Sequence, residues 1–194
     1  MGDIILFMEK SFLNSDDDKL MWHENSKKLL LKTRVFDVTE RNSTAFDGTT
    51  GNYIVNDAPE WAIIIPVHNE NFLMVKQWRH GEAKLSVEFP GGVIEKGEDP
   101  LVAAKRELME ETGAVAGKLT ELGTFNPNPA LFSNHLHVFL AEDLEFTNKQ
   151  NLDKDEFVNY LEIPKNQVMA NMGNSEFFHA LMASALCLYL CRSV

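Results

Sequence analysis

Short apolar runs separated by polar turns fill much of the chain and predict a domain rich in β-strands. Residues 61–79 hold two such runs on either side of a His-Asn-Glu-Asn turn, the pattern of a buried β-hairpin. Further segments have strand-like patterns: residues 29–40, 53–56, 118–125, 135–144 and 157–163. Residues 84–93 are predicted to form a strand that runs into a Gly-Gly loop. Because strands and helices mix without regular alternation, the sequence favours an α+β or mixed α/β fold over a doubly wound sheet.

One amphipathic helix is predicted with a defined start and end. Asp99 is a good N-cap, Pro100 suits the first helical position, and Gly113 can end the helix in a left-handed conformation. The apolar residues that we expect to pack against the sheet gather on one stripe: Leu101, Ala104 and Leu108. A second, apolar helix is predicted from about Ser175 to the end of the chain.

The predicted organisation is one domain with an N-terminal extension. The chain has 194 residues, of which 44% are hydrophobic, so it can bury a real core. An acidic run at residues 15–19 is typical of a solvated connection. We therefore expect residues 1–57 to form an arm with strands and residues 58–194 to form the main domain.

The net charge of the chain restricts its partners. A charge of -11 would repel a nucleic-acid backbone, whereas a small anionic substrate held through a divalent metal remains compatible. The N-terminus lacks the basic and long apolar regions of a signal peptide, and the longest apolar run, residues 180–191, is too short to cross a bilayer. We expect a cytoplasmic protein that binds neither nucleic acid nor membrane. Cys187 and Cys191 are expected to be small buried side chains rather than a redox or zinc pair.

Three glutamates crowd onto the first predicted helix: Glu107, Glu110 and Glu111. The like-charged i,i+4 pair of Glu107 and Glu111 costs a few tenths of a kcal/mol if nothing compensates it. A hard divalent cation resolves the conflict, because Mg²⁺ binds carboxylates together with waters and substrate phosphates. The preceding Gly91 and Gly92 allow the backbone to approach such a cation. The alternative is a solvated acidic helix face.

The residues around these glutamates follow a fixed spacing, Gly-x5-Glu-x7-Arg-Glu-apolar-x-Glu-Glu-x-Gly. The positions in this pattern are Gly92, Glu98, Arg106, Glu107, Leu108, Glu110, Glu111 and Gly113, and they match the Nudix box. The chain therefore resembles a Nudix hydrolase, with a departure at Ala114, where a larger aliphatic residue is more usual. The resemblance implies the Nudix fold, an α/β/α sandwich with a mixed β-sheet, to which this chain adds a small N-terminal β-strand segment. It also implies cleavage of a nucleoside diphosphate linked to another moiety, with Mg²⁺ or Mn²⁺ as cofactor.

The resemblance implies a role for several positions of this sequence. The implied metal ligands are the Gly91 carbonyl and the carboxylates of Glu107, Glu110 and Glu111. Arg106 would orient the glutamates through charge-assisted hydrogen bonds, which also fits the chemistry of a guanidinium. Glu98 would support the loop or bind an additional metal ion.

Segments flanking the box resemble the branch that hydrolyses ADP-ribose and other nucleoside diphosphate sugars. These segments are VKQWR, EFPGG, NPNPALFSNHLHVFLAEDL and DEFVNYLEIP. In that branch the arginine of the Gln-aromatic-Arg segment contacts the diphosphate or the sugar, which implies this role for Arg79; a surface salt bridge is the alternative. Trp78 beside it is expected in the core or an interface. A substrate-binding proline is implied at Pro129, although Ala130 follows it where glycine is usual.

The general base is expected in the acidic loop before the last predicted strand. Glu156 matches the branch best, with Asp153 and Asp155 as alternatives, and these acids could equally be solvated loop residues. Glu156, Arg106 and Glu110 together form the predicted catalytic set. The expected products are a nucleoside monophosphate and a sugar phosphate, such as AMP and ribose 5-phosphate from ADP-ribose.

Several alternatives remain open at the level of the sequence. Within the family, the substrate could be a dinucleoside polyphosphate, an oxidised nucleoside triphosphate or a coenzyme diphosphate. A sensor that binds a nucleotide sugar without cleaving it, or a plain acidic interaction domain, would not need the complete set of box glutamates. His135 and His137 share one strand face, but without a third ligand at a matching spacing a hydrogen-bonded role is favoured over a zinc site.

The branch resemblance also implies a homodimer in which residues 1–57 act as a dimerisation segment and contribute to the partner's site. Phe12, Trp22 and Phe36 are candidates either for the interface or for base stacking. The sequence offers no basis for choosing between these two roles.

Overall fold

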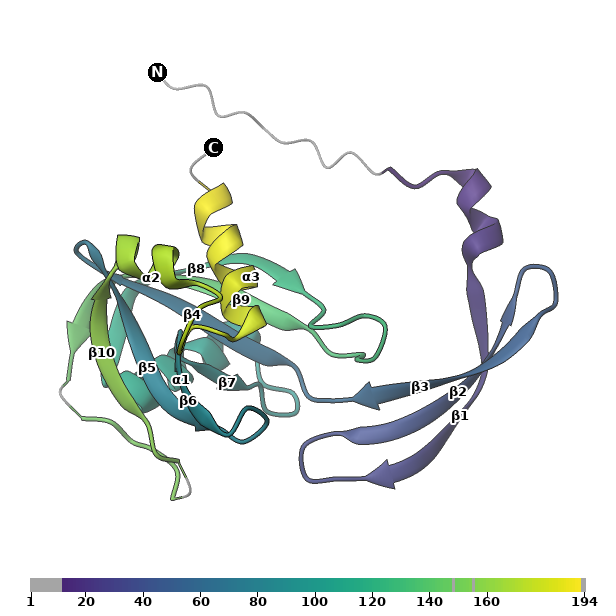
Figure 1. Ribbon diagram of the computed structural model, residues 1–194, viewed down its shortest axis with the longest axis horizontal. Helices are drawn as coiled ribbons and strands as arrows, with labels where there is room; N and C mark the ends of the chain where they lie inside the picture. Colours follow the sequence, from purple (N-terminus) through teal and green to yellow (C-terminus); the bar gives the residue numbers. More distant parts are fainter. Residues whose placement is uncertain (1–11, 148, 155, 193–194) are drawn as a thin grey trace. The chain divides into compact units, whose positions relative to one another are not determined.

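The chain divides into two compact units, with the boundary between Asp57 and Ala58. The computed structural model describes residues 12–147, 149–154 and 156–192 (Figure 1). In the first unit, a short 3₁₀ helix precedes a three-stranded antiparallel sheet in the order β1-β2-β3. Its elements are η1 (Ser15–Leu20), β1 (Trp22–Lys32), β2 (Asp37–Ala45) and β3 (Thr50–Asp57).

The sheet of the first unit has little core of its own. Every residue of β1 is exposed, and across the three strands only Thr39 is buried. Polar contacts link the strands, because Asp57 accepts hydrogen bonds from Thr39 Oγ1 at 2.9 Å and from Arg41 Nη2 at 2.6 Å. A small sheet without a buried apolar face needs a packing partner for stability.

The second unit is built on a seven-stranded mixed sheet. Its main path runs β10-β5-β4-β9-β8, with β6 paired to β5 and β7 paired to β4. β4 and β9 are parallel, whereas the other pairs are antiparallel. The strands are β4 (Trp61–His68), β5 (Asn71–Arg79), β6 (Lys84–Glu88), β7 (Gly91–Val93), β8 (Ala114–Phe125), β9 (Leu136–Phe146) and β10 (Asn159–Pro164).

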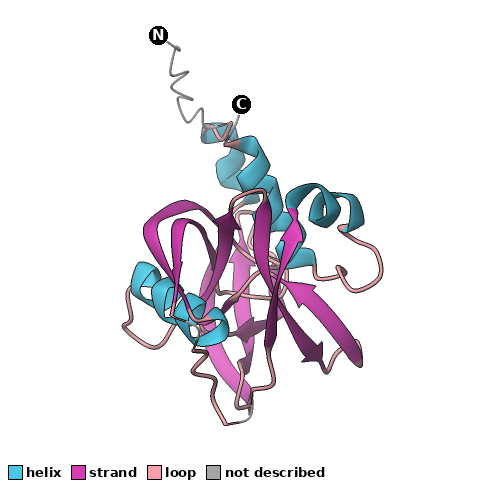
Figure 2. Cartoon of the chain, turned by 90° about the vertical axis from the view of Figure 1, so that its left-hand side faces the viewer, coloured by secondary structure: helices cyan, strands magenta, loops and turns pink. Residues whose placement is uncertain are grey.

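Helices cover both faces of this sheet (Figure 2). They are α1 (Pro100–Thr112), α2 (Lys165–Asn171) and α3 (Ala180–Cys191). Ile64 and Leu73 pack in the apolar cluster under α1, and Ile63 and Ile65 pack in the cluster under α2 and α3. Successive strand residues point to opposite faces, so one continuous apolar strand supplies both layers. The sandwich of α1, sheet, and α2 with α3 is the predicted architecture.

The predicted ends of the helix that carries the glutamates are confirmed. The Asp99 side chain accepts a hydrogen bond from the Leu101 N–H at 2.9 Å, and Gly113 ends α1 with a φ of 67°. The predicted apolar stripe was partly wrong, because Leu101 lies in the exposed first turn. The apolar residues of α1 that are buried are Ala103, Ala104 and Leu108.

Two predicted strand segments differ in detail from the structure. Segment 29–40 contains a turn, because the Thr33 hydroxyl accepts hydrogen bonds from the N–H groups of Val35 and Phe36. In segment 84–93 the predicted strand is β6, whereas the predicted Gly-Gly loop forms the short strand β7, which pairs with β4. A pattern of apolar residues reports neither the turn nor this pairing.

The helices outside the box differ from the prediction. The acidic run at residues 15–19 is largely exposed, as expected for a solvated connection, and it forms η1, which Asn14 caps. The short helix α2 was not predicted, and α3 begins after its N-cap His179 rather than near Ser175. The prediction that Cys187 and Cys191 are buried was wrong, because both lie on the outer side of α3. No helix in the described part of the chain is long and apolar enough to cross a membrane.

Candidate active site

Two glycines at the start of β7 bring two glutamates of α1 against the backbone. Gly91 donates its N–H to Glu111 Oε2 at 2.8 Å. A Cβ at Gly92 would lie 2.6 Å from the Glu107 carboxylate, and a Cβ at Gly91 would lie 2.2 Å from the carbonyl oxygen of Ala62. Neither position has room for a side chain, so the two glycines set how closely Glu107 and Glu111 approach β7.

Arg106 donates hydrogen bonds to three carboxylates of the box. Its Nε and Nη2 each donate to Glu98 at 3.0 Å, which makes a bidentate pair. Its Nη1 donates to Glu107 Oε1 at 2.7 Å and to Glu110 Oε2 at 3.1 Å. One guanidinium therefore fixes the orientation of three glutamates, and it draws Glu110 toward itself.

Glu107 and Glu111 are buried, with exposed fractions of 9% and 4%. Burial raises the pKa of Glu111 to about 8; the charges of Glu107 and Glu156 add to this rise, whereas the Gly91 N–H opposes it. Burial also raises the pKa of Glu107, although hydrogen bonding and charge from Arg106 act in the opposite direction. The positive charge around these two neighbouring carboxylates is therefore too small to offset the cost of burying them in the ionised form.

Arg79 and Glu156 approach this pair from distant parts of the chain. Arg79 ends β5, and its charge acts on the pKa of Glu111. Glu156 lies in the loop before β10, and its charge acts on the pKa values of both buried glutamates. The Glu156 carboxylate accepts a hydrogen bond from the Asp153 N–H at 3.2 Å. Asp155, the other alternative for the general base, lies outside the described residues.

Arg79 has a partner that sequence reasoning missed. Its Nε donates to Glu88 Oε1 at 2.7 Å and its Nη2 donates to Glu88 Oε2, so the pair is bidentate. Glu88 ends β6 and has an exposed fraction of 0%. Burial tends to raise the pKa of Glu88, but the hydrogen bonds and charge of Arg79 hold it below the ordinary value. The sequence signal that could have indicated this pair is Glu88 itself, an acidic residue within the largely apolar segment LSVEF.

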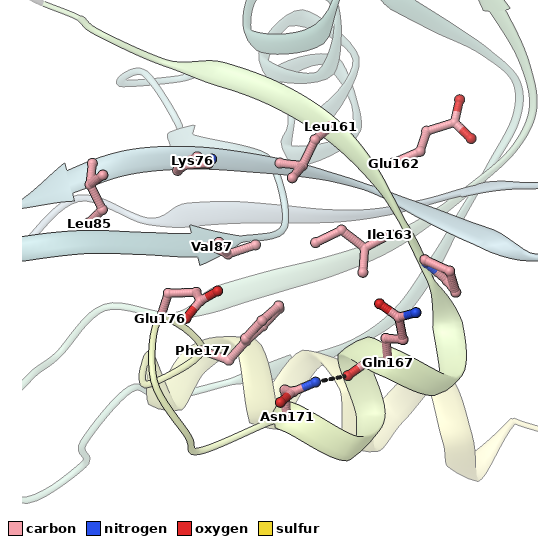
Figure 3. Close-up of a pocket in the computed structure, with 11 residues that line it drawn as sticks. Lys76, Leu85, Val87, Leu161, Glu162, Ile163, Gln167, Asn171, Glu176 and Phe177 are labelled. Atoms are coloured by element: carbon pink, nitrogen blue, oxygen red, sulfur yellow. Dashed lines mark hydrogen bonds between the residues drawn. The ribbon is translucent and has the colours of Figure 1, made fainter.

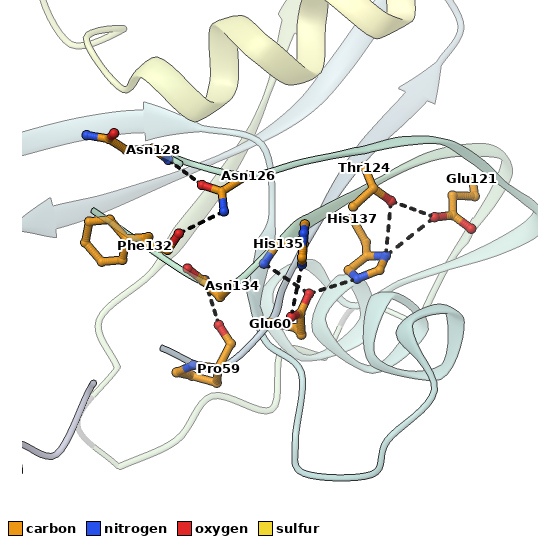
Figure 4. A network of polar contacts seen from close by, with 10 residues as sticks. All are labelled: Pro59, Glu60, Glu121, Thr124, Asn126, Asn128, Phe132, Asn134, His135 and His137. Carbon is orange, nitrogen blue, oxygen red and sulfur yellow. Dashed lines mark hydrogen bonds and ion pairs between the residues drawn. The ribbon is translucent and has the colours of Figure 1, made fainter. Parts of the chain in front are cut away.

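Pro129 and Trp78 have different surroundings. Pro129 is exposed in the loop between β8 and β9. In that loop the Asn126 side chain donates to the Phe132 carbonyl at 2.9 Å and accepts from the Asn128 N–H at 2.9 Å (Figure 4). Trp78 is 48% exposed, so the core position considered for it was wrong and the interface position stays a prediction. Contact between Pro129 and a substrate also stays a prediction.

His135 and His137 are hydrogen-bonded, as the sequence favoured. His135 Nδ1 lies 3.4 Å from one oxygen of Glu60, and His137 Nε2 lies 3.2 Å from the other oxygen (Figure 4). The other ring nitrogen of His137 lies 3.5 Å from Glu121 Oε1. The Glu60 carbonyl accepts the Ile94 N–H, so this network braces the strand ends beside the box loop.

A pocket lies on the α2 side of the sheet (Figure 3). Its volume is about 560 Å³, and the Asn171 side chain at its rim donates to the Gln167 carbonyl at 2.8 Å. The residues that line it are Lys76, Leu85, Val87, Leu161, Glu162, Ile163, Pro164, Gln167, Asn171, Glu176 and Phe177. None of the predicted site residues belongs to this lining.

The chemistry of the glutamate pair suits a hard divalent cation. Glu107, Glu111 and the backbone of Gly91 would offer oxygen ligands, which Mg²⁺ and Mn²⁺ prefer. A bound cation would also compensate two carboxylates whose pKa values burial raises. Among the described residues, however, no group of three His, Cys, Asp or Glu side chains is already arranged to hold a metal ion, and Glu110 turns toward Arg106.

Known proteins resemble both the sequence and the fold. An ADP-ribose pyrophosphatase of Bacillus subtilis is 33% identical over 163 residues, which cover 83% of this chain and 88% of that protein. A methanol dehydrogenase activator of Bacillus methanolicus is 35% identical over 142 residues, which cover 72% of this chain and 74% of that protein. A crystal structure of an ADP compounds hydrolase matches with a TM-score of 0.76 at 25% identity, covering 89% of this chain and 92% of that chain.

The family model described as NUDIX domain matches residues 58–181. This range includes the mixed sheet, the glycines of β7 and the glutamates of α1. Together with the structural match, it confirms the fold that the box implied. The chain therefore belongs to the Nudix family.

Proposed function

We propose that this chain is a pyrophosphohydrolase that cleaves the diphosphate linkage of a nucleoside diphosphate sugar, with ADP-ribose or an ADP-sugar as the first candidate. The observation that carries the proposal is the pair of buried box glutamates, Glu107 and Glu111, beside the guanidinium of Arg79. Relatives named ADP-ribose pyrophosphatase and ADP compounds hydrolase support the choice of substrate class. The products would be AMP and a sugar phosphate.

The proposed cofactor is Mg²⁺, with Mn²⁺ as the alternative. Glu107, Glu111 and the Gly91 carbonyl would hold it, and Glu110 would join them after leaving Arg106. When bound, the cation supplies charge neutralisation of the diphosphate and lowers the pKa of water.

Four side chains would orient the ligands, bind the substrate and accept a proton. Arg106 keeps Glu107 in place through its hydrogen bond of 2.7 Å. Arg79 offers hydrogen-bond donors to the diphosphate oxygens, which a planar guanidinium binds well. Glu156 accepts the proton of the water that attacks phosphorus, and Pro129 lines the sugar or base side of the substrate. The exposed position of Glu156 leaves its carboxylate accessible to water.

The direct test is a substrate panel. We expect the chain to release phosphatase-sensitive products from ADP-ribose and ADP-glucose with Mg²⁺, and to release none when EDTA is present. The comparison substrates, each tested separately in the same assay, are UDP-glucose, GDP-mannose, a dinucleoside tetraphosphate and 8-oxo-dGTP. Preferential cleavage of the tetraphosphate or of 8-oxo-dGTP would overturn the proposed substrate class.

A second candidate function follows from the relative named methanol dehydrogenase activator. In this case the chain would regulate a partner enzyme after binding a nucleotide. The panel separates the two functions: the second predicts no cleavage of any compound, while a nucleotide sugar still raises the melting temperature of the chain.

We also propose that the chain is a homodimer held together through residues 1–57. The support is the sheet of the first unit, where the apolar side chains of Trp22, Leu29 and Tyr53 are exposed and the strands bury little of their own surface. A second copy of the chain would supply the missing apolar partner.

Light scattering is expected to give twice the 22.0 kDa mass of one chain. Leu29→Glu should shift the mass toward 22.0 kDa, because Leu29 lies opposite Thr39 on the same face as Trp22 and Tyr53. Leu31→Glu is the matched control, since the bulge between these leucines places Leu31 opposite Val38 on the other face. A wild-type monomer at all concentrations would contradict the proposal.

A further inference from the structure

Glu88 is the most deeply buried acidic side chain near the candidate site. It has an exposed fraction of 0%, and both carboxylate oxygens accept hydrogen bonds from Arg79. Val87, the preceding residue of β6, faces the opposite side of the sheet and packs in the cluster under α2 and α3. The pleat of β6 therefore fixes the direction in which Glu88 points.

The Arg79 end of this pair is partly exposed. The Arg79 side chain is 39% exposed, although Glu88 is not. Its Nε and Nη2 are bound to Glu88, whereas Nη1 has no hydrogen-bond partner among the described residues. Glu88 lies three residues before Gly91, whose N–H donates to Glu111 Oε2 at 2.8 Å, so the chain brings the Glu88–Arg79 pair near the buried glutamates. The charge of Arg79 also acts on the pKa of Glu111.

An ion pair with a fully buried carboxylate is weak support for stability, because desolvation of the Glu88 charge offsets much of its attraction to Arg79. Its clearer effect is geometric: a bidentate contact fixes the plane of the guanidinium. His179 faces the pair from the start of α3, where its Nδ1 accepts the Leu181 N–H at 3.2 Å. Burial lowers the pKa of His179, so its ring does not supply a competing positive charge to Glu88.

We propose that Glu88 is a positioning residue: it holds the guanidinium of Arg79 in one plane so that the free Nη1 meets a diphosphate oxygen of the substrate. The proposal rests on the proposed function and deepens it. Without Glu88, Arg79 would carry the same charge but would sample many orientations, and each productive encounter would lose entropy.

The main test is Glu88→Gln, which preserves the shape of the side chain. Glutamine has only one acceptor oxygen, and its NH2 group donates, so it can accept from Nε or from Nη2 but not from both. The bidentate contact is therefore lost, and Arg79 can turn to solvent. We expect KM for ADP-ribose to rise about tenfold to a hundredfold, the range for a lost hydrogen bond to a charged group, with little change in kcat. Glu88→Asp retains the charge and should recover part of the effect.

A double-mutant cycle shows whether Glu88 acts through Arg79. In the background of Arg79→Met, Glu88→Gln should cause no further loss in kcat/KM, and the neutral pair also avoids an unpaired buried carboxylate. Equal losses in the presence and absence of Arg79 would overturn the proposal. An unchanged KM in Glu88→Gln would overturn it as well.

A second measurement does not depend on turnover. In ¹⁵N NMR spectra of the wild-type chain, the Arg79 Nε–H should exchange slowly with water, and its signal should shift when inorganic pyrophosphate is added. Fast exchange in the wild type, or the same pyrophosphate response in Glu88→Gln, would contradict the positioning role. If the chain cleaves no nucleotide sugar, the substrate proposal fails, while these signals still report whether Glu88 positions Arg79 toward a diphosphate.

Discussion

Glu111→Gln is expected to lower kcat with ADP-ribose by about 10³-fold or more, because several kcal/mol of cation-assisted stabilisation would be lost. The variant should nevertheless fold well. Glutamine can still accept the Gly91 N–H, which in the wild type lies 2.8 Å from Glu111 Oε2. The loss would therefore report the missing charge and not a missing hydrogen bond.

The same substitution should stabilise the metal-free protein at high pH. The pKa of Glu111 in the folded state is about 8, compared with an ordinary value of 4.5. Between these values the folded state retains a proton that the unfolded state has released, so stability falls as pH rises. Glu111→Gln removes this titration, and in EDTA its melting temperature should exceed that of the wild type at pH values above the folded pKa. The two proteins should converge near the ordinary pKa.

Thermal unfolding with and without Mg²⁺ completes the test. The cation should raise the melting temperature of the wild type, because it binds only the folded site, and it should raise that of Glu111→Gln much less. Glu145→Gln, an exposed glutamate on β9, is the matched control and should behave as the wild type in both assays. Equal Mg²⁺ effects on wild type and Glu111→Gln would remove Glu111 from the proposed ligands.

The parts of the site that lie close together in the sequence were predictable. Asp99, Pro100 and Gly113 define α1 through local capping, and the spacing of Glu107 and Glu111 places both on one side of a helix. The resemblance to the Nudix box then supplied the fold, which the family match confirms. Helix-capping rules and a short sequence motif were therefore sufficient to predict the box and the helix that carries its glutamates.

The parts that depend on contacts between distant segments were not predictable. Glu88 and Arg79 lie on neighbouring strands but not opposite each other, because the register of β5 with β6 places Glu88 opposite Val75 and Arg79 opposite Lys84. Their contact depends on the direction of two long side chains in the folded protein. The exposure of Cys187 and Cys191 depends on which face of α3 meets the sheet, and a helix with apolar residues on all sides does not indicate this face. Such features can be determined only from the way distant segments pack together in the folded protein.

Glu156→Gln is expected to lower kcat by about 10²-fold to 10⁴-fold, the usual contribution of a general base. The charge of Glu156 raises the pKa values of Glu107 and Glu111, so its removal makes both easier to ionise. Affinity for Mg²⁺ should therefore be unchanged or higher. A loss of turnover combined with retained Mg²⁺ binding would separate proton transfer from metal binding.

Asp153→Asn is the matched control for Glu156→Gln. Asp153 contributes its backbone to the turn, since its N–H donates to Glu156 Oε2 and its carbonyl accepts the Glu156 N–H at 3.1 Å. The substitution leaves both contacts in place, so kcat should remain near that of the wild type. A large loss in Asp153→Asn with normal turnover in Glu156→Gln would transfer the role of general base to Asp153.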